Sequence, residues 1–130
     1  MLDAVLARGR AMAEARMRDT CRIRRPTGET TDADGNVVKT YGPNLYAGKC
    51  RFQQPNAQAA QADVGEDYLL LLRMEVHLPM SVVGLKAGDE VDAVGSATDP
   101  DLPGRVFVIR DLAHASDKTA RRVGVTERTS

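Results

Sequence analysis

The chain has 130 residues, which is the length of one domain and is enough to bury a core without disulfides or metal ions. Hydrophobic residues make up 42% of the chain and charged residues 28%, and no run approaches the roughly 18 apolar residues of a membrane-spanning helix. The formal net charge is zero, which disfavours a free nucleic-acid-binding protein, because phosphate neutralisation supplies most of the affinity of such proteins.

The charges are distributed unevenly along the chain. Residues 1–25 carry a net charge of +4, residues 26–105 a net charge of −6, and residues 106–130 a net charge of +2. Basic ends around an acidic middle favour association between copies through complementary surfaces. The alternative is that these charges only solvate separate faces of the domain.

Two cysteines, Cys21 and Cys50, are too few for a disulfide framework. No signal peptide is predicted, because Asp3, Arg8 and Arg10 interrupt the first apolar stretch. We therefore expect the protein to be made in the cytoplasm.

Residues 1–18 are predicted to form an amphipathic helix. Gly9 lies within its apolar face, where it costs about 1 kcal/mol relative to Ala unless another part of the chain packs closely against it. A helix of this length is marginally stable alone and needs a surface to lie on. The apolar positions at helical spacing are Leu2, Val5, Leu6, Gly9, Met12, Ala13 and Met17.

From residue 20 the apolar period changes to two, which predicts β-strands. A first strand covers residues 20–24 and is interrupted by Pro26-Thr27-Gly28. Residues 32–36 form an Asp-Gly turn that leads into a return strand over Val37–Tyr41. The next strand covers residues 45–53, with Cys50 on its apolar side and Arg51 on the other.

Residues 53–67 are rich in Gln and Ala and predict a long loop, and loops of this length are uncommon unless they are functional. The polar residues of this candidate channel loop are Gln53, Gln54, Asn56, Gln58 and Gln61.

Further strands are predicted over residues 68–78, 91–95, 105–113 and 121–128. The last two pair through the turn Ser116-Asp117-Lys118. The fold class is therefore mainly β: a single domain (1–130) with an N-terminal amphipathic helix (1–18) and a small antiparallel β-barrel or sandwich over residues 19–128.

The sequence contains no recognisable catalytic or metal site. His77 and His114 have no adjacent nucleophile motif, and the spacing of Cys21, Cys50 and the two histidines lacks any zinc-binding pair. The cysteines are interpreted as small core residues and each histidine as solvated or hydrogen-bonded. We expect no enzymatic activity and no cofactor.

Acidic residues gather at three places, namely Glu66-Asp67, Asp89-Glu90-Asp92 and Asp99/Asp101. All three are predicted to lie in turns, where Asp forms local hydrogen bonds with the backbone.

The Arg-rich start could face DNA or an acidic partner, or it could be a solvated helix face. The candidate residues of this basic face are Arg8, Arg16, Arg18, Arg22 and Arg24. No aromatic residues are interleaved with them to stack on bases, so any contact with DNA would be directed at phosphates.

Several short motifs occur in a familiar order after the N-terminal helix: Arg22–Pro26, Thr31–Asn36 with its D-x-x-G turn, and Leu45–Arg51 with its Tyr-Ala pair. Leu85–Asp89 and Arg105–Ile109 follow. In this layout the chain resembles the head–tail joining (head-closure or stopper) proteins of tailed phages, of the actinobacterial-phage type.

This resemblance implies a structural virion protein of the phage neck, made in the host cytoplasm. Such a subunit forms a homo-oligomeric ring, expected to be a hexamer or dodecamer, between the portal–adaptor ring and the tail-terminator or tail proteins. Double-stranded DNA passes through the channel, and a loop, here residues 53–67, would close it. No contact with a membrane is implied.

Three alternatives stay open at this stage. The first is a tail-terminator or another neck subunit, and the second is a small barrel that binds nucleic acid, for which exposed aromatic residues would be needed. The third is an enzyme that depends on His77 or His114.

Overall fold

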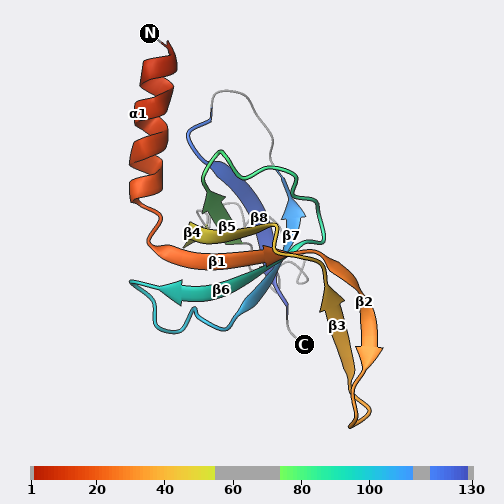
Figure 1. Cartoon of the computed structure of the whole chain (residues 1–130). Helices are drawn as coiled ribbons and strands as arrows, with labels where there is room; N and C mark the ends of the chain where they lie inside the picture. Colours follow the sequence, from red (N-terminus) through yellow and green to blue (C-terminus); the bar gives the residue numbers. More distant parts are fainter. Residues whose placement is uncertain (1, 55–73, 113–117, 129–130) are drawn as a thin grey trace, which may run out of the picture.

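The structure, a computed structural model, describes residues 2–54, 74–112 and 118–128 (Figure 1). Asn56, Gln58 and Gln61 of the predicted channel loop, His114, and the first part of the predicted strand 68–78 lie outside the described residues.

Six antiparallel strands form a closed barrel, which confirms the predicted mainly β fold. Each strand pairs with its neighbours in the order β1-β4-β5-β8-β7-β6, and β6 closes the barrel against β1. A closed barrel leaves no unpaired edge in the sheet. The strands are β1 (Asp19–Arg24), β4 (Tyr46–Gln53), β5 (Met74–Leu78), β6 (Glu90–Ser96), β7 (Val106–Asp111) and β8 (Arg121–Glu127).

The core fills the interior of this barrel with one side chain from every second position of each strand, as a period of two requires. Phe52 and Phe107 stack inside it with ring centroids 5.3 Å apart. Cys21 and Cys50 are both buried in the core as free thiols, as the sequence predicted. With no Trp and few aromatics, the core is otherwise built from Val, Leu, Ile and Ala.

The segment 26–41 does not belong to the barrel, contrary to the prediction that residues 19–128 form one barrel. Strands β2 (Pro26–Thr31) and β3 (Val37–Tyr41) form a separate two-stranded sheet, which we call the β-arm. Pro26 ends β1, as predicted, but it also begins β2, because proline is tolerated at the first position of an edge strand. Gly35 supplies the positive φ angle (86°) that the turn at the tip of the β-arm requires.

Helix α1 (Leu2–Ala15) stands on one end of the barrel and ends earlier than residue 18. None of its residues is fully buried, so it rests on the barrel along one edge only. Gly9 marks the contact: a Cβ atom there would lie 2.7 Å from Cγ2 of Thr119, so a larger residue would require the Thr119 side chain to shift. The Arg10 guanidinium donates to the Lys118 carbonyl (3.2 Å), and Glu14 pairs with Lys49.

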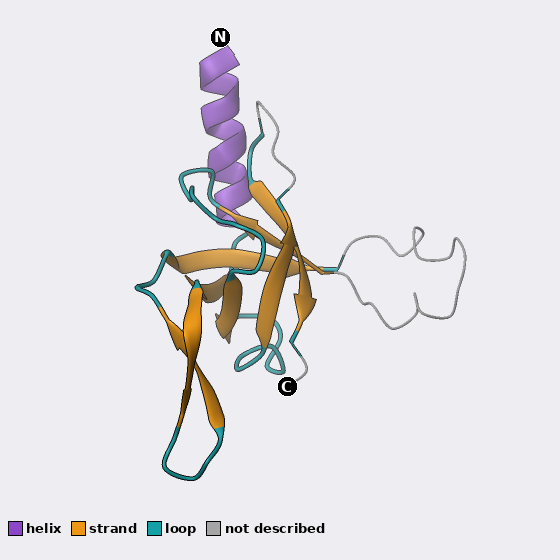
Figure 2. Cartoon of the chain, turned by 90° about the vertical axis from the view of Figure 1, so that its right-hand side faces the viewer, coloured by secondary structure: helices purple, strands orange, loops and turns teal. Residues whose placement is uncertain are grey.

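Helix α1 and the β-arm leave the barrel at opposite ends, as Figure 2 shows. The part of the chain that the structure describes contains no helix with the length and apolar character to cross a membrane.

Candidate functional site

Three buried carboxylates, Asp89, Glu90 and Asp92, lie at the root of the β-arm, and we call them the carboxylate cluster. Their exposed fractions are 1%, 2% and 9%. The prediction that they lie in a turn is wrong for two of them, because Glu90 and Asp92 belong to β6. Asp89 does lie in a turn and stabilises it, since one carboxylate oxygen accepts a hydrogen bond from the Lys86 amide at 2.8 Å.

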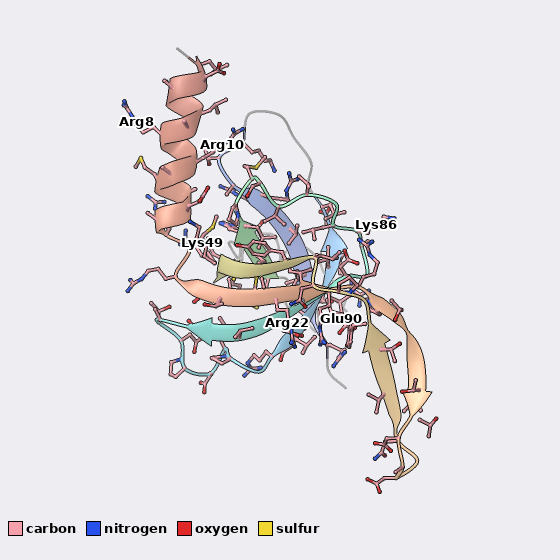
Figure 3. The ribbon with its side chains drawn as sticks, viewed as in Figure 1. Arg8, Arg10, Arg22, Lys49, Lys86 and Glu90 are labelled. Carbon is pink, nitrogen blue, oxygen red and sulfur yellow. The ribbon has the colours of Figure 1, made fainter. Side chains whose placement is uncertain are left out.

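Glu90, which Figure 3 shows at the root of the β-arm, connects three separate parts of the chain. Lys39 Nζ lies 2.8 Å from Oε2, while the Tyr41 hydroxyl (2.6 Å) and Arg128 NH1 (2.8 Å) both donate to Oε1. Burial alone would raise the pKa of Glu90, but the hydrogen bonds from Lys39 and Tyr41 and the charge of Arg128 hold it below its ordinary value. Glu90 is therefore ionised, and its contacts hold the β-arm to the barrel.

The other two carboxylates are paired with arginines from β1 and the residue that follows it. Arg25 donates two hydrogen bonds to the Asp89 carboxylate, from Nε at 2.8 Å and from NH2 at 3.1 Å. Arg22 and Arg24 both pair with Asp92, the first through Nε at 2.9 Å. Because each buried charge meets a cation, the cluster fixes structure rather than holding a reactive carboxyl group.

The predicted basic face is divided by these contacts. Arg22 and Arg24 are engaged with Asp92, and Arg24 also stacks over the Tyr41 ring at 3.8 Å from its centroid, so neither is a free cation. Arg8, Arg16 and Arg18 are exposed at or just after α1, and their side chains have no partner among the described residues.

A second polar site lies where the end of α1 meets the outer surface of β4, β5 and β8, and we call it the basic hollow. Its volume is about 570 Å³. The strand register places Arg51, His77 and Arg122 side by side in one row across these three strands. Arg16, just after α1, reaches the same hollow, while Gln53 and Glu75 form the next row.

His77 is the most buried polar residue of this hollow, with 8% of its surface exposed. Its Nε2 lies 3.1 Å from Oε1 of Glu75, so the prediction of a hydrogen-bonded histidine is compatible with the structure, whereas full solvation is not. Burial lowers the pKa of His77, and the charges of Arg122 and Arg51 lower it further against the opposing effect of Glu75. The histidine is therefore neutral near pH 7.

The predicted channel-loop residues begin in this hollow. Gln53 is the last residue of β4 and lines it, rather than belonging to a loop, while Gln54 is exposed just beyond.

Cys21 and Cys50 lie on neighbouring strands, and the nearby Cys21 thiol together with burial raises the pKa of the Cys50 thiol. They point into the core, whereas His77 lies on the outer face among the residues of the hollow. No group of three or more His, Cys, Asp or Glu side chains that could hold a metal ion occurs in the described ranges.

The sequence did not single out Arg51 or Arg122. Both alternate with core residues, which indicated only that they face outward. Their proximity to His77 follows from strand pairing between segments far apart in the chain, and no local signal specifies that register.

Comparison with known proteins gives a family and a fold. The model of a family of unknown function, DUF6093, matches residues 9–126. No curated protein matches the sequence. Among solved structures, the solution structure of protein SF1141 from Shigella flexneri 2a matches with a TM-score of 0.50 and 18% sequence identity, over 87% of this chain and 92% of that one. At this identity the likeness shows a shared fold alone.

Proposed function

We propose that this chain, which belongs to the DUF6093 family of unknown function, is a structural subunit of the neck of a tailed-phage particle. In this role it is a head-to-tail connector (stopper) that forms a ring beneath the portal and adaptor, closes the DNA channel and provides the surface to which the tail attaches.

The observation that carries the proposal is the pair of projections that expose apolar side chains. On α1, the exposed apolar residues Leu2, Val5 and Met12 are 60%, 63% and 59% exposed, and on the β-arm Val37 and Val38 are 65% and 45% exposed. Exposed apolar side chains that extend away from a domain mark surfaces for protein partners.

Stability considerations support the same conclusion. An isolated helix of about 12–15 residues is marginal in water, and an isolated two-stranded hairpin is marginal at best. Both projections gain stability by docking on neighbouring subunits, which is the expected behaviour of a protein that works in an assembly.

The polar chemistry of the described residues supports a structural role over an enzymatic one. The three buried carboxylates are neutralised by ion pairs, and His77 is paired with Glu75. These contacts stabilise the positions of strands and of the β-arm.

A nucleic-acid-binding barrel would need exposed aromatic rings on which bases stack. Phe107 is buried, Phe52 packs against it, and Tyr41 is covered by Arg24. Tyr46 is half-buried, packs against the core and donates its hydroxyl to the Lys49 carbonyl. The described aromatic residues therefore favour the connector over this alternative.

Within the proposal, the segment that joins β4 to β5 keeps the channel role. Its composition is polar and largely uncharged through residue 62, which suits contact with passing DNA without tight binding of phosphates. Gln54, the first residue of this segment, is exposed.

Deleting the gene from the phage or prophage that carries it tests the proposal. We expect filled or leaking heads and unattached tails in electron micrographs, and restoration of tailed particles by the wild-type gene supplied in trans. Tailed, infectious particles that form at normal yield without the protein would refute the connector role. Mass spectrometry of purified particles provides the parallel measurement, since a neck protein must be present in them.

A further inference from the structure

We infer that the acidic tip of the β-arm of one copy docks in the basic hollow of the next copy, so that identical subunits join head to tail. This inference rests on the proposed function, because it names the contact that would join subunits within a ring.

The hollow offers positive charge that no described side chain neutralises. Arg51 and Arg122 flank His77 on three paired strands, and Arg16 approaches from the end of α1. None of these three arginine side chains has a hydrogen-bond or ion-pair partner among the residues that the structure describes. Glu75 is engaged with the neutral His77, so the hollow keeps an excess of cations.

The tip of the β-arm offers the opposite charge. Residues 27–38 contain three acidic residues, Glu29, Asp32 and Asp34, and no Lys or Arg. The Asp32 carboxylate accepts hydrogen bonds from the amides of Asp34 and Asn36, both at 2.9 Å, which fixes the shape of the turn. In the described ranges the carboxylates of Glu29 and Asp34 have no partner.

The two surfaces lie where a head-to-tail contact requires them. The hollow lies beside the base of α1, and the β-arm extends from the other end of the barrel (Figures 1 and 2). A surface that binds a different surface on an identical copy produces a ring when the rotation closes and a filament when it does not.

The β-arm is also held in a defined direction, which reduces the cost of docking it. Lys39 and Tyr41 on β3 bind Glu90 on β6, and Arg25, beside β2, binds Asp89. A preorganised arm loses little conformational freedom on binding.

Association of the purified protein at low salt, measured by sedimentation velocity, tests the inference. We expect wild-type protein to self-associate, and we expect reversal of either surface, by R51E/R122E or by E29K/D34K, to weaken the apparent Kd by at least about tenfold, because paired charges become like charges. The variant with both reversals should regain association. The control is Lys86→Glu, which reverses one positive charge on an exposed loop outside both surfaces and matches the charge change of Arg122→Glu alone.

Circular dichroism must first show that each variant is folded. Should R51E/R122E unfold, Arg122→Glu alone provides the same test, because Arg122 is exposed and its side chain has no hydrogen-bond or ion-pair partner among the described residues. Wild-type protein that remains monomeric at high concentration and low salt overturns the inference, and so does association that both single-surface reversals leave unchanged.

A parallel titration with duplex DNA tests the alternative that the basic hollow binds DNA phosphates. If R51E/R122E weakens DNA binding while E29K/D34K changes neither DNA binding nor self-association, the hollow binds phosphates and the inference is wrong. The protein content of purified virions distinguishes failure of this inference from failure of the proposed function. If the variants enter virions normally, only the docking contact is wrong. If the wild-type protein is absent from virions, the connector role is wrong.

Discussion

Lys39 on the β-arm and Glu90 on barrel strand β6 form an ion pair of 2.8 Å, although 51 positions separate them in the sequence. The Glu90 side chain is 2% exposed and that of Lys39 is 41% exposed. The pair joins an element outside the barrel to the barrel wall, so the orientation of the β-arm depends on a buried charge.

Replacing Glu90 with Gln should destabilise the protein by about 2 kcal/mol, since Lys39 and Arg128 lose their counter-ion but remain partly solvated. Urea unfolding at pH 7 measures the change. Glu29→Gln is the matched control on the exposed part of the β-arm and should stay within about 0.5 kcal/mol of wild type. Equal effects of the two substitutions would contradict the conclusion that Glu90 holds the β-arm to the barrel.

Acid should remove the stabilisation that Glu90 provides. Because its pKa in the folded protein lies below the ordinary value of 4.5, this contribution is complete above that pH and is lost as the pH falls through the folded pKa. The difference in unfolding free energy between wild type and Glu90→Gln should therefore shrink between pH 5 and pH 3. A difference that is independent of pH would show that Glu90 does not titrate as described.

The Arg122→Gln substitution should raise the pKa of His77, because it removes a cation from the row in which His77 lies. Burial would still hold this pKa below the ordinary value of 6.5. Titration by NMR of the two histidine rings gives the measurement, and His114→Gln identifies which signal belongs to His77. An unchanged pKa would mean that Arg122 and His77 are not neighbours.

A lowered histidine pKa also has a defined effect on stability. The unfolded chain binds the proton at a higher pH than the folded protein does, so the contribution of His77 to stability is complete above about pH 6.5 and is lost as the pH falls from there through the folded pKa. The effect should be smaller in Arg122→Gln than in wild type. Urea unfolding at pH 7.5 and at pH 5.5 compares them.

Gly9→Ala should stabilise the protein by less than the roughly 1 kcal/mol that helix propensity predicts, because the new Cβ meets Thr119. The clash falls on Cγ2 of Thr119, which Thr119→Ser removes. The double variant should therefore recover the missing stabilisation. Thermal unfolding of the four proteins forms the cycle, and simple additivity would show that α1 does not pack against Thr119.

Val5→Gln combined with Met12→Gln should leave the stability of the isolated protein within about 0.5 kcal/mol of wild type, since both side chains are largely exposed. The same variant should fail to restore tailed particles to the deletion strain, because two of the three exposed apolar residues of α1 are then polar. The control is Val94→Gln on the barrel wall, where an exposed apolar side chain is also replaced. Full complementation by the α1 variant would show that these exposed apolar residues of α1 are not needed for assembly.

The spacing of apolar residues was sufficient to predict the N-terminal helix, the barrel strands and the class of the fold, but not strand β2 (Pro26–Thr31). Alternation specifies which side of a strand faces the core, so Cys21, Ile23 and Val76 could be placed inside before the structure was known. The prediction was incomplete at Pro26, where one strand ends and another begins, because that boundary depends on pairing between β2 and β3.

The polar sites were beyond the reach of the sequence. The acidic run at residues 89–92 has the composition of a turn, and only the packing of β1 and the β-arm over β6 buries its carboxylates against five cations: Arg22, Arg24, Arg25, Lys39 and Arg128.

The sequence by itself determined which residues face the core, because burial of apolar surface acts on each segment through its local period. Tertiary structure alone decided which outward-facing charges meet, as in the row Arg51, His77 and Arg122, because strand register brings together residues that no local pattern relates. It also decided that the β-arm leaves the barrel, since that depends on ion pairs between distant segments.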